Sequence, residues 1–222
     1  MGQSIQSSIL RVYETMLEWY GPQKWWPGDN NIEIIVGAIL TQGTAWTNVE
    51  KALLNLKTAG VLSLSKLNII SQGELETLIR PCGAFRVKAR RIKAFIFHVY
   101  GKYMGDLDKF LSRDILNLRK ELLSIHGVGN ETADAIILYA SEKPSFVVDS
   151  YTRRILSRLK LAPTNNSYRS YQDLFQENLP LDQSFYSEYH ALLVSLAKDV
   201  CHKIPVCDRC CLVNMCPTGS NR

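Results

Sequence analysis

The sequence predicts an all-α fold, because apolar residues recur at helical spacing and no segment keeps the alternation of a strand. The clearest apolar stripe consists of Ala133, Ile136, Ile137 and Ala140. A second stripe runs through residues 186–200 and leads into a group of cysteines. The chain has no internal repeat and no low-complexity segment, so we expect packed helices throughout.

Composition is typical of a folded protein and does not decide the function. With 222 residues, of which 46% are hydrophobic and 21% charged, the chain can form one domain or two closely apposed lobes. A net charge of +5 suits a cationic face for nucleic acid, but many proteins of this charge bind none. Residues 1–8 do not resemble a signal peptide, and no apolar run has the length of a membrane span. We therefore expect a cytoplasmic protein that makes no membrane contact.

Helices are expected where breaking residues bound an apolar stripe. The first two cover residues 3–20 and 31–40, and a third follows shortly after the second. Pro and Gly keep residues 24–29 non-helical, so Trp25 and Trp26 lie in a packed loop, where their rings can also fill the core.

Later helices are expected to start at Phe85 and after Asp114, and to cover residues 151–161. Cations are concentrated around the first of these starts, at Arg80, Arg86, Lys88, Arg90, Arg91 and Lys93. Such a run is usually a solvated helix face, although it can also contact phosphate oxygens.

A tight turn, Gly127-Val128-Gly129, separates two amphipathic helices and predicts a helix-hairpin-helix. Asn130 stands where the N-cap of the second helix is expected. Glycines let backbone N–H groups approach an anion closely, and the helix offers its positive N-terminus. The same pattern is also found in αα-turns that have only a structural role.

A lone carboxylate, Asp149, follows the apolar run Phe146–Val148 about twenty residues after the hairpin. It can cap the next helix, serve chemistry, or do both. Four cysteines near the C-terminus are close enough in sequence to hold one inorganic centre, namely Cys201, Cys207, Cys210 and Cys216. Their spacing alone fits either a four-iron cluster or a single zinc, and Cys211 is an additional neighbour.

The stretch Leu122–Arg153 resembles the signature of the endonuclease III-like (HhH-GPD) DNA glycosylases. The resemblance implies that the hairpin residues Gly127, Val128, Gly129 and Thr132 contact DNA phosphates and that Asp149 is the catalytic aspartate. Gln42, in Leu40-Thr41-Gln42, corresponds to the residue that enters the duplex and fills the space of the extruded base. A solvated loop glutamine is the alternative for Gln42.

The residue at position 131 distinguishes subclasses within this family. Bifunctional members have a lysine there, whose amine attacks the sugar to form a Schiff base. This chain has Glu131, which cannot form that adduct, so we expect a monofunctional enzyme that leaves an abasic site and has no lyase activity.

The chain is most similar to the 3-methyladenine branch of the family, through Glu131 and the aromatic residues of the expected base pocket, Trp25, Trp26, Pro27 and Trp46. N3- and N7-alkylated purines are cationic, and an indole cage attracts a cation. The resemblance implies excision of such bases from double-stranded DNA by a monomeric, nucleoid-associated protein.

For the fold, the resemblance implies two helical lobes, at residues 22–136 and at residues 1–21 with 137–222, that grip DNA between them. The cysteine loop, residues 201–216, would hold a [4Fe–4S] cluster, with zinc as the alternative. Its first gap is one residue shorter than the family's, and the best-known members of the 3-methyladenine branch lack this loop.

Two other functions stay open. A uracil/thymine mismatch or oxidised-pyrimidine glycosylase would use the same fold. A non-catalytic protein that binds damaged DNA would keep the hairpin and the cysteine loop, but it would have no need of Asp149.

Overall fold

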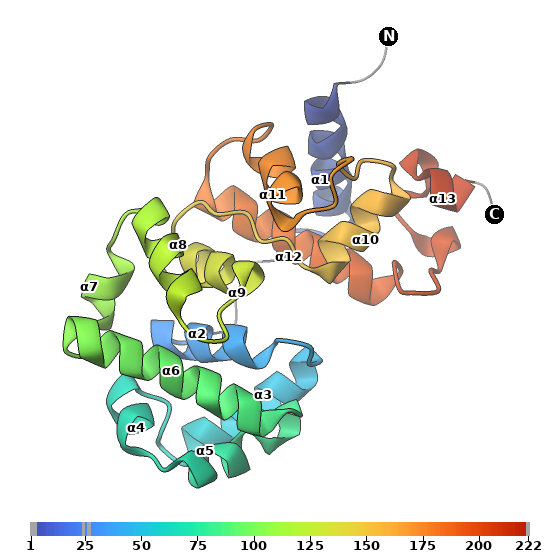
Figure 1. Cartoon of the computed structure of the whole chain (residues 1–222). Helices are drawn as coiled ribbons and strands as arrows, with labels where there is room; N and C mark the ends of the chain where they lie inside the picture. The colour runs from blue at the N-terminus through green and yellow to red at the C-terminus, as the bar shows by residue number, and fades with distance from the viewer. Residues whose placement is uncertain (1–3, 24, 26–27, 221–222) are drawn as a thin grey trace. The chain divides into compact units, whose positions relative to one another are not determined.

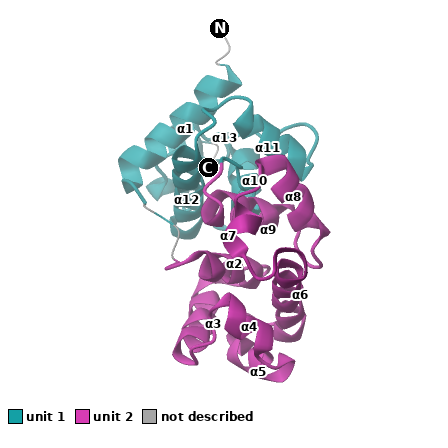
Figure 2. Cartoon of the chain, turned by 90° about the vertical axis from the view of Figure 1, so that its left-hand side faces the viewer, with its two compact units in different colours: residues 1–26, 144–222 teal, residues 27–143 magenta. Residues whose placement is uncertain are grey.

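The computed structural model describes residues 4–23, 25 and 28–220, and over these residues the chain is helical with no strand, as predicted (Figure 1). It divides into two compact units (Figure 2). Unit 1 joins Met1–Trp26 to Pro144–Arg222, and unit 2 is Pro27–Lys143.

Unit 2 is built around one fully buried helix. Its helices are α2 (Asn31–Leu40), α3 (Trp46–Thr58), α4 (Leu64–Ile69), α5 (Gln72–Leu78), α6 (Phe85–Tyr103), α7 (Leu107–Leu111), α8 (Ile115–Ser124) and α9 (Asn130–Ala135). Every residue of α2 from Ile32 to Leu40 is buried, and the helix packs against α3, α6 and α9. Apart from Glu33, which pairs with Lys57 at 2.7 Å, the buried part of this helix is apolar on every face, as is typical of a core helix.

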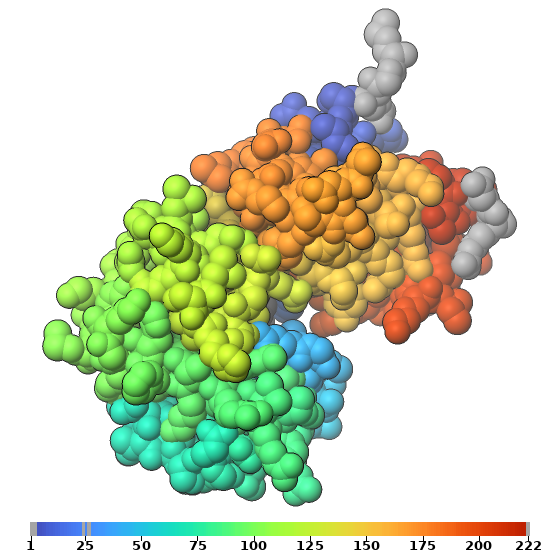
Figure 3. All heavy atoms as spheres, in the orientation of Figure 1, coloured from blue at the N-terminus to red at the C-terminus, as the bar shows by residue number. Residues whose placement is uncertain are grey.

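Two short elements complete unit 2. A 3₁₀ turn, η1 (Arg80–Cys82), precedes α6, and a π-helical turn, η2 (Ile136–Ala140), continues α9. The predicted stripe from Ala133 to Ala140 therefore changes from α to π geometry at Ile136. In the space-filling view, side chains of α6 and of α8 and α9 form one continuous surface (Figure 3).

Unit 1 is organised around its longest helix. It contains α1 (Ile5–Tyr20), α10 (Ser150–Arg158), α11 (Tyr168–Gln176), α12 (Gln183–Asp199), α13 (Pro217–Ser220) and two 3₁₀ turns, η3 (Cys207–Arg209) and η4 (Val213–Met215). Helix α12 packs against both α1 and α10. Aromatic rings form much of the core, where Phe146 stacks on Phe175 with a distance of 3.8 Å between the ring centroids. The buried hydroxyl of Tyr189 donates to the Ile9 carbonyl at 2.7 Å.

Most predicted helices are present, with small differences at their ends. The second helix covers Asn31–Leu40 as predicted. The first begins at Ile5 rather than residue 3, because the Ser4 hydroxyl caps it by accepting from Ser7 N–H at 3.1 Å. Within the described ranges, no helix combines the length and the apolar content that crossing a membrane requires.

Candidate functional site

The hairpin turn between α8 and α9 requires glycine at position 127. Gly127 has φ +85°, and a Cβ there would lie 2.2 Å from the Cγ atom of Arg91. The predicted cap was wrong by one residue, because Gly129 is the N-cap of α9 and Asn130 is its first residue. The Asn130 side chain instead accepts from the Arg119 guanidinium at 3.0 Å.

Val128 is an internal part of this turn. The residue is only 6% exposed, and its N–H donates to the Ile125 carbonyl at 3.1 Å. Val128 is thus committed to the turn itself. Gly127 and Gly129, which are also predicted to bind phosphate, lie on either side of Val128 in the turn.

Gln42 contacts the hairpin directly. Its Nε2 atom donates to the Gly127 carbonyl at 2.9 Å and to the Thr132 hydroxyl at 2.8 Å, while its Oε1 atom accepts from the Arg91 guanidinium. The structure therefore brings together three of the predicted DNA-binding residues, Gln42, Gly127 and Thr132. Gln42 is not a solvated loop side chain.

Lys88 fixes the loop that carries Gln42. Its side chain is almost fully buried, at 2% residue exposure, and Nζ donates to the Leu40 carbonyl at 2.8 Å, to the Cys82 carbonyl at 3.0 Å and to the Thr44 hydroxyl. Burial lowers the pKa of this ammonium group. The cationic run that contains Lys88 was expected to be solvated or to contact phosphates, and the buried Lys88 side chain does neither.

Lys93 is a second exception in the same run, because its Nζ donates to the Leu67 carbonyl at 2.8 Å and to the Asn68 carbonyl at 3.1 Å. Arg86 and Arg90, in contrast, are exposed. The cationic run therefore combines internal anchors with solvent-facing charges.

The predicted base-pocket residues fall in both units. Glu131 is exposed in the first turn of α9, and Trp46 is the half-buried first residue of α3, both in unit 2. Trp25 is half-buried in unit 1. Trp26 and Pro27 lie outside the described residues.

Asp149 stands at the end of a buried, extended segment of unit 1. This segment has no strand partner, so side chains of α11 satisfy its backbone. Gln176 accepts from Phe146 N–H at 3.0 Å, and Gln172 donates to the Phe146 carbonyl at 2.9 Å. These bonds fix the point at which the chain enters α10, and with it Asp149.

The two carboxylate oxygens of Asp149 have different surroundings. Oδ1 caps α10, accepting from Thr152 N–H at 2.7 Å and from the Thr152 hydroxyl at 2.8 Å. Oδ2 lies 3.6 Å from Nε2 of His190, a separation longer than that of a hydrogen bond. Burial raises the pKa of Asp149, but His190 and the bonds from Thr152 outweigh it, so the pKa lies below its usual value. The group is therefore a carboxylate at neutral pH.

His190, which the sequence analysis missed, lies beside both Asp149 and Trp25. The imidazole is buried on α12, and its ring centroid is 5.7 Å from that of Trp25. Ser187, one turn earlier on α12, donates to the Trp25 carbonyl at 3.1 Å. A sequence signal existed, because His190 is a polar residue four positions after Tyr186 on the predicted apolar stripe.

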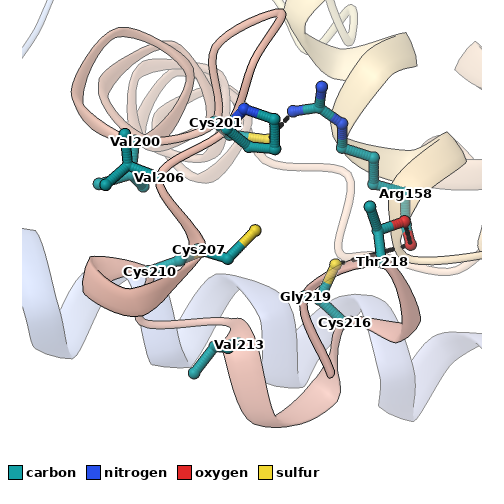
Figure 4. Close-up of a pocket in the computed structure, with 11 residues that line it drawn as sticks. Arg158, Val200, Cys201, Val206, Cys207, Cys210, Val213, Cys216, Thr218 and Gly219 are labelled. Carbon is teal, nitrogen blue, oxygen red and sulfur yellow. Dashed lines mark hydrogen bonds between the residues drawn. The ribbon is translucent and has the colours of Figure 1, made fainter. Parts of the chain in front are cut away.

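The four predicted cysteine ligands line one pocket in unit 1. Cys201, Cys207, Cys210 and Cys216 surround it together with Arg158 and the apolar side chains of Val200 and Val213 (Figure 4). Arg158 donates to the Cys201 sulfur at 3.1 Å and to the carbonyls of His202 and Lys203 at 2.7 and 2.8 Å. Over the described part of the chain, no three His, Cys, Asp or Glu side chains converge closely enough to hold a single metal ion.

The chemistry of this donor set can be compared with that of an inorganic centre. Four thiols around an apolar pocket offer the ligand number and type that an iron–sulfur cluster requires. The Arg158 guanidinium would also complement the negative charge that thiolate ligands bring.

Sequence comparisons identify the family. Residues 36–181 match the HhH-GPD superfamily of base excision DNA repair proteins. A candidate DNA repair glycosylase of Methanocaldococcus jannaschii is 45% identical, over 94% of this chain and 95% of its own length. An endonuclease III of Sulfolobus acidocaldarius is 26% identical, over 84% of this chain and 82% of its own length.

Solved structures share the fold. An endonuclease III in a non-covalent complex with DNA has a TM-score of 0.84 at 23% identity, covering 100% of this chain and 99% of that chain. The 3-methyladenine DNA glycosylase MagIII of H. pylori, bound to 1,N6-ethenoadenine, has a TM-score of 0.75 at 27% identity, covering 87% of this chain and 97% of that chain. Together these findings support a DNA-binding base excision glycosylase. The chain belongs to the HhH-GPD superfamily of base excision DNA repair proteins.

Proposed function

We propose that this protein is a monofunctional DNA glycosylase that removes N3- or N7-alkylated purines and leaves an abasic site. The observation that carries the proposal is the environment of Asp149. One oxygen is held by the cap of α10, while the other is turned toward His190, and the group stays ionised although buried. Cleavage of a base from its sugar passes through an oxocarbenium-like transition state, which such a carboxylate stabilises.

The absence of lyase chemistry is inferred from Glu131. This carboxylate is exposed in the first turn of α9, at the position where bifunctional relatives carry the Schiff-base lysine. Glu131 also tolerates a cationic base better than a lysine would. Both properties favour a monofunctional enzyme that acts on a charged leaving group.

The choice of alkylated purines rests on the aromatic residues and on one structural relative. Trp25 lies beside the His190–Asp149 pair in unit 1, and we assign it to the base pocket together with Trp26, Pro27 and Trp46. A desolvated indole contributes on the order of 1–2 kcal/mol to binding a cationic ring. The similarity to the 3-methyladenine glycosylase MagIII supports the same substrate class.

For DNA binding, we assign phosphate contacts to the backbone N–H groups of Gly127 and Gly129. Val128 would support the turn, since its N–H is already bonded. Gln42 would fill the gap left by the flipped base, and Thr132 would hold Gln42 against the hairpin until then. We expect a monomer bound to double-stranded DNA in the nucleoid.

We further propose that Cys201, Cys207, Cys210 and Cys216 hold a [4Fe–4S] cluster. Such a cluster would connect the four cysteines of the C-terminal loop to one another. Arg158 of α10 already holds this loop by hydrogen bonds to Cys201 and His202. The role of the cluster would be structural. Iron and acid-labile sulfide in the purified protein would support the cluster. One zinc ion per chain, without iron, would instead support the zinc alternative.

The test is excision from matched oligonucleotides that carry 3-methyladenine, 7-methylguanine, uracil, G·T, A·8-oxoguanine or thymine glycol, assayed with and without alkali. Release of methylated purines, with strand breaks only after alkali, is the expected result. Release of uracil or thymine would keep Asp149 but overturn the pocket assignment. DNA binding without release of any base would leave a non-catalytic damage-binding protein.

A further inference from the structure

His190 lies between the Asp149 carboxylate and the Trp25 indole. It projects from α12, which packs on α10, the helix that Asp149 caps. Its Nε2 atom is 3.6 Å from Asp149 Oδ2, and its ring is tilted 39° to Trp25 at a centroid distance of 5.7 Å. One buried ring thus touches two groups to which the proposed function gives different tasks.

If packing were its only role, a histidine at this position would stabilise the fold less than an apolar residue would. Its residue exposure is 5%, and its neighbours Tyr189, Leu192 and Leu193 on α12 are fully buried. Burying a polar ring costs free energy unless it faces a compensating group, which an apolar residue would not need. The Nε2 atom faces Oδ2, the one oxygen of Asp149 that the helix cap does not use.

We propose that His190 is a positioning residue for base excision, which holds Oδ2 of Asp149 and the indole of Trp25 in one fixed arrangement. The inference rests on the proposed function and deepens it. Two hydrogen bonds from Thr152 fix the position of Oδ1. They do not fix the orientation of the carboxylate plane, which depends on the group beside Oδ2. The imidazole sets that plane, and its ring face aligns the first wall of the base pocket.

The prediction concerns the chemical step rather than DNA binding. A displacement of about 1 Å at a reacting group can lower a rate about 100-fold. We therefore expect His190→Ala to lower the single-turnover excision rate by about 10- to 100-fold. Affinity for DNA with a non-cleavable abasic analogue should stay close to that of the wild type, because the hairpin and Gln42 lie in unit 2.

The matched variant is His190→Gln, which places a polar amide group near the position of Nε2 and should recover most of the rate. Ser184→Ala, six residues before His190 on the same helix, controls for a side-chain truncation elsewhere on α12. Melting temperatures of all three variants show whether unit 1 stays folded.

Two results would overturn the inference. One is an unchanged excision rate in His190→Ala, and the other is a rate for His190→Gln no better than that of His190→Ala. Asp149→Asn separates this failure from failure of the proposed function. Loss of excision in Asp149→Asn with normal His190→Ala activity would refute only the role of His190, while full activity in Asp149→Asn would refute the catalytic assignment itself.

Discussion

The Asp149 carboxylate caps a helix and, in the proposed function, also serves the chemistry, as the sequence allowed. Its Oδ1 atom caps α10, and its Oδ2 atom stays available because the cap uses a single oxygen. The pKa of Asp149 is depressed, so its contribution to stability is fully present above the unfolded value of 3.8 and is lost as the pH falls through the lower folded value.

Asp149→Asn should therefore flatten the acid limb of the stability curve below about pH 4. The reason is that the asparagine amide cannot take up the proton that destabilises the wild-type cap. Urea unfolding at a series of pH values measures this effect. Parallel acid limbs in the two proteins would show that another carboxylate controls acid unfolding.

The two hairpin glycines make a matched pair for a test of phosphate binding. Gly127→Ala should cost about 1–3 kcal/mol, because φ is +85° and the new Cβ would collide with Arg91. Gly129→Ala should cost no more than about 1 kcal/mol, the penalty of alanine at an N-cap, since φ is −94° and no atom lies within 4 Å of its Cβ.

Gly129→Ala should nevertheless weaken DNA binding, because the methyl group would occupy the space through which a phosphate approaches the backbone. Urea unfolding and DNA titration separate the two effects. If Gly129→Ala binds DNA as tightly as the wild type does, phosphates do not approach the hairpin at this residue.

Glu131 permits a test of the substrate charge. Glu131→Gln should slow excision of cationic 7-methylguanine more than excision of a neutral base such as 1,N6-ethenoadenine, because only the cation gains from the carboxylate. Parallel single-turnover rates on the two substrates measure the difference. Equal losses on both would remove the electrostatic argument, and a borohydride-trapped complex of the wild type would contradict monofunctional chemistry.

At the scale of elements, the sequence predicted features that follow from local spacing and missed those that depend on tertiary contacts. The span of α2 and the position of the hairpin follow from apolar periodicity and from glycine. Lys88 was misassigned because nothing in a run of cations distinguishes the one whose stem enters the core. His190 was missed because the apolar stripe of its helix predicts only core packing for this position. That its ring lies beside Asp149 follows from the packing of α12 on α10, which the sequence does not show.

The loop after α2 depends on the buried ammonium group of Lys88. Lys88→Met should destabilise unit 2 by about 2–4 kcal/mol, because the carbonyls of Leu40 and Cys82 lose a charged donor. The matched control is Lys93→Met, which removes a similar donor from the Leu67 and Asn68 carbonyls.

Both lysine variants should melt earlier, but only Lys88→Met should also weaken binding to DNA with an abasic analogue, because only that loop carries Gln42. Binding measured well below both melting temperatures tests the distinction. Equal affinities of the two variants would mean that the proposed Gln42 contact does not depend on this anchor.

At the scale of the whole molecule, the C-terminal loop of unit 1 differs from the packed cores of the two units in how it can be stabilised. Unit 2 has a continuous apolar core around α2, whereas the C-terminal loop of unit 1 has short turns and a four-cysteine pocket.

If the pocket holds the cluster, Cys207→Ser should abolish bound iron and sulfide. It should also raise the rate of backbone amide hydrogen exchange in unit 1 while leaving the rate in unit 2 unchanged. Cys211→Ser is the matched control, because this neighbouring thiol is not among the proposed ligands, and it should retain the iron. Loss of iron in both variants, or in neither, would require a different ligand set.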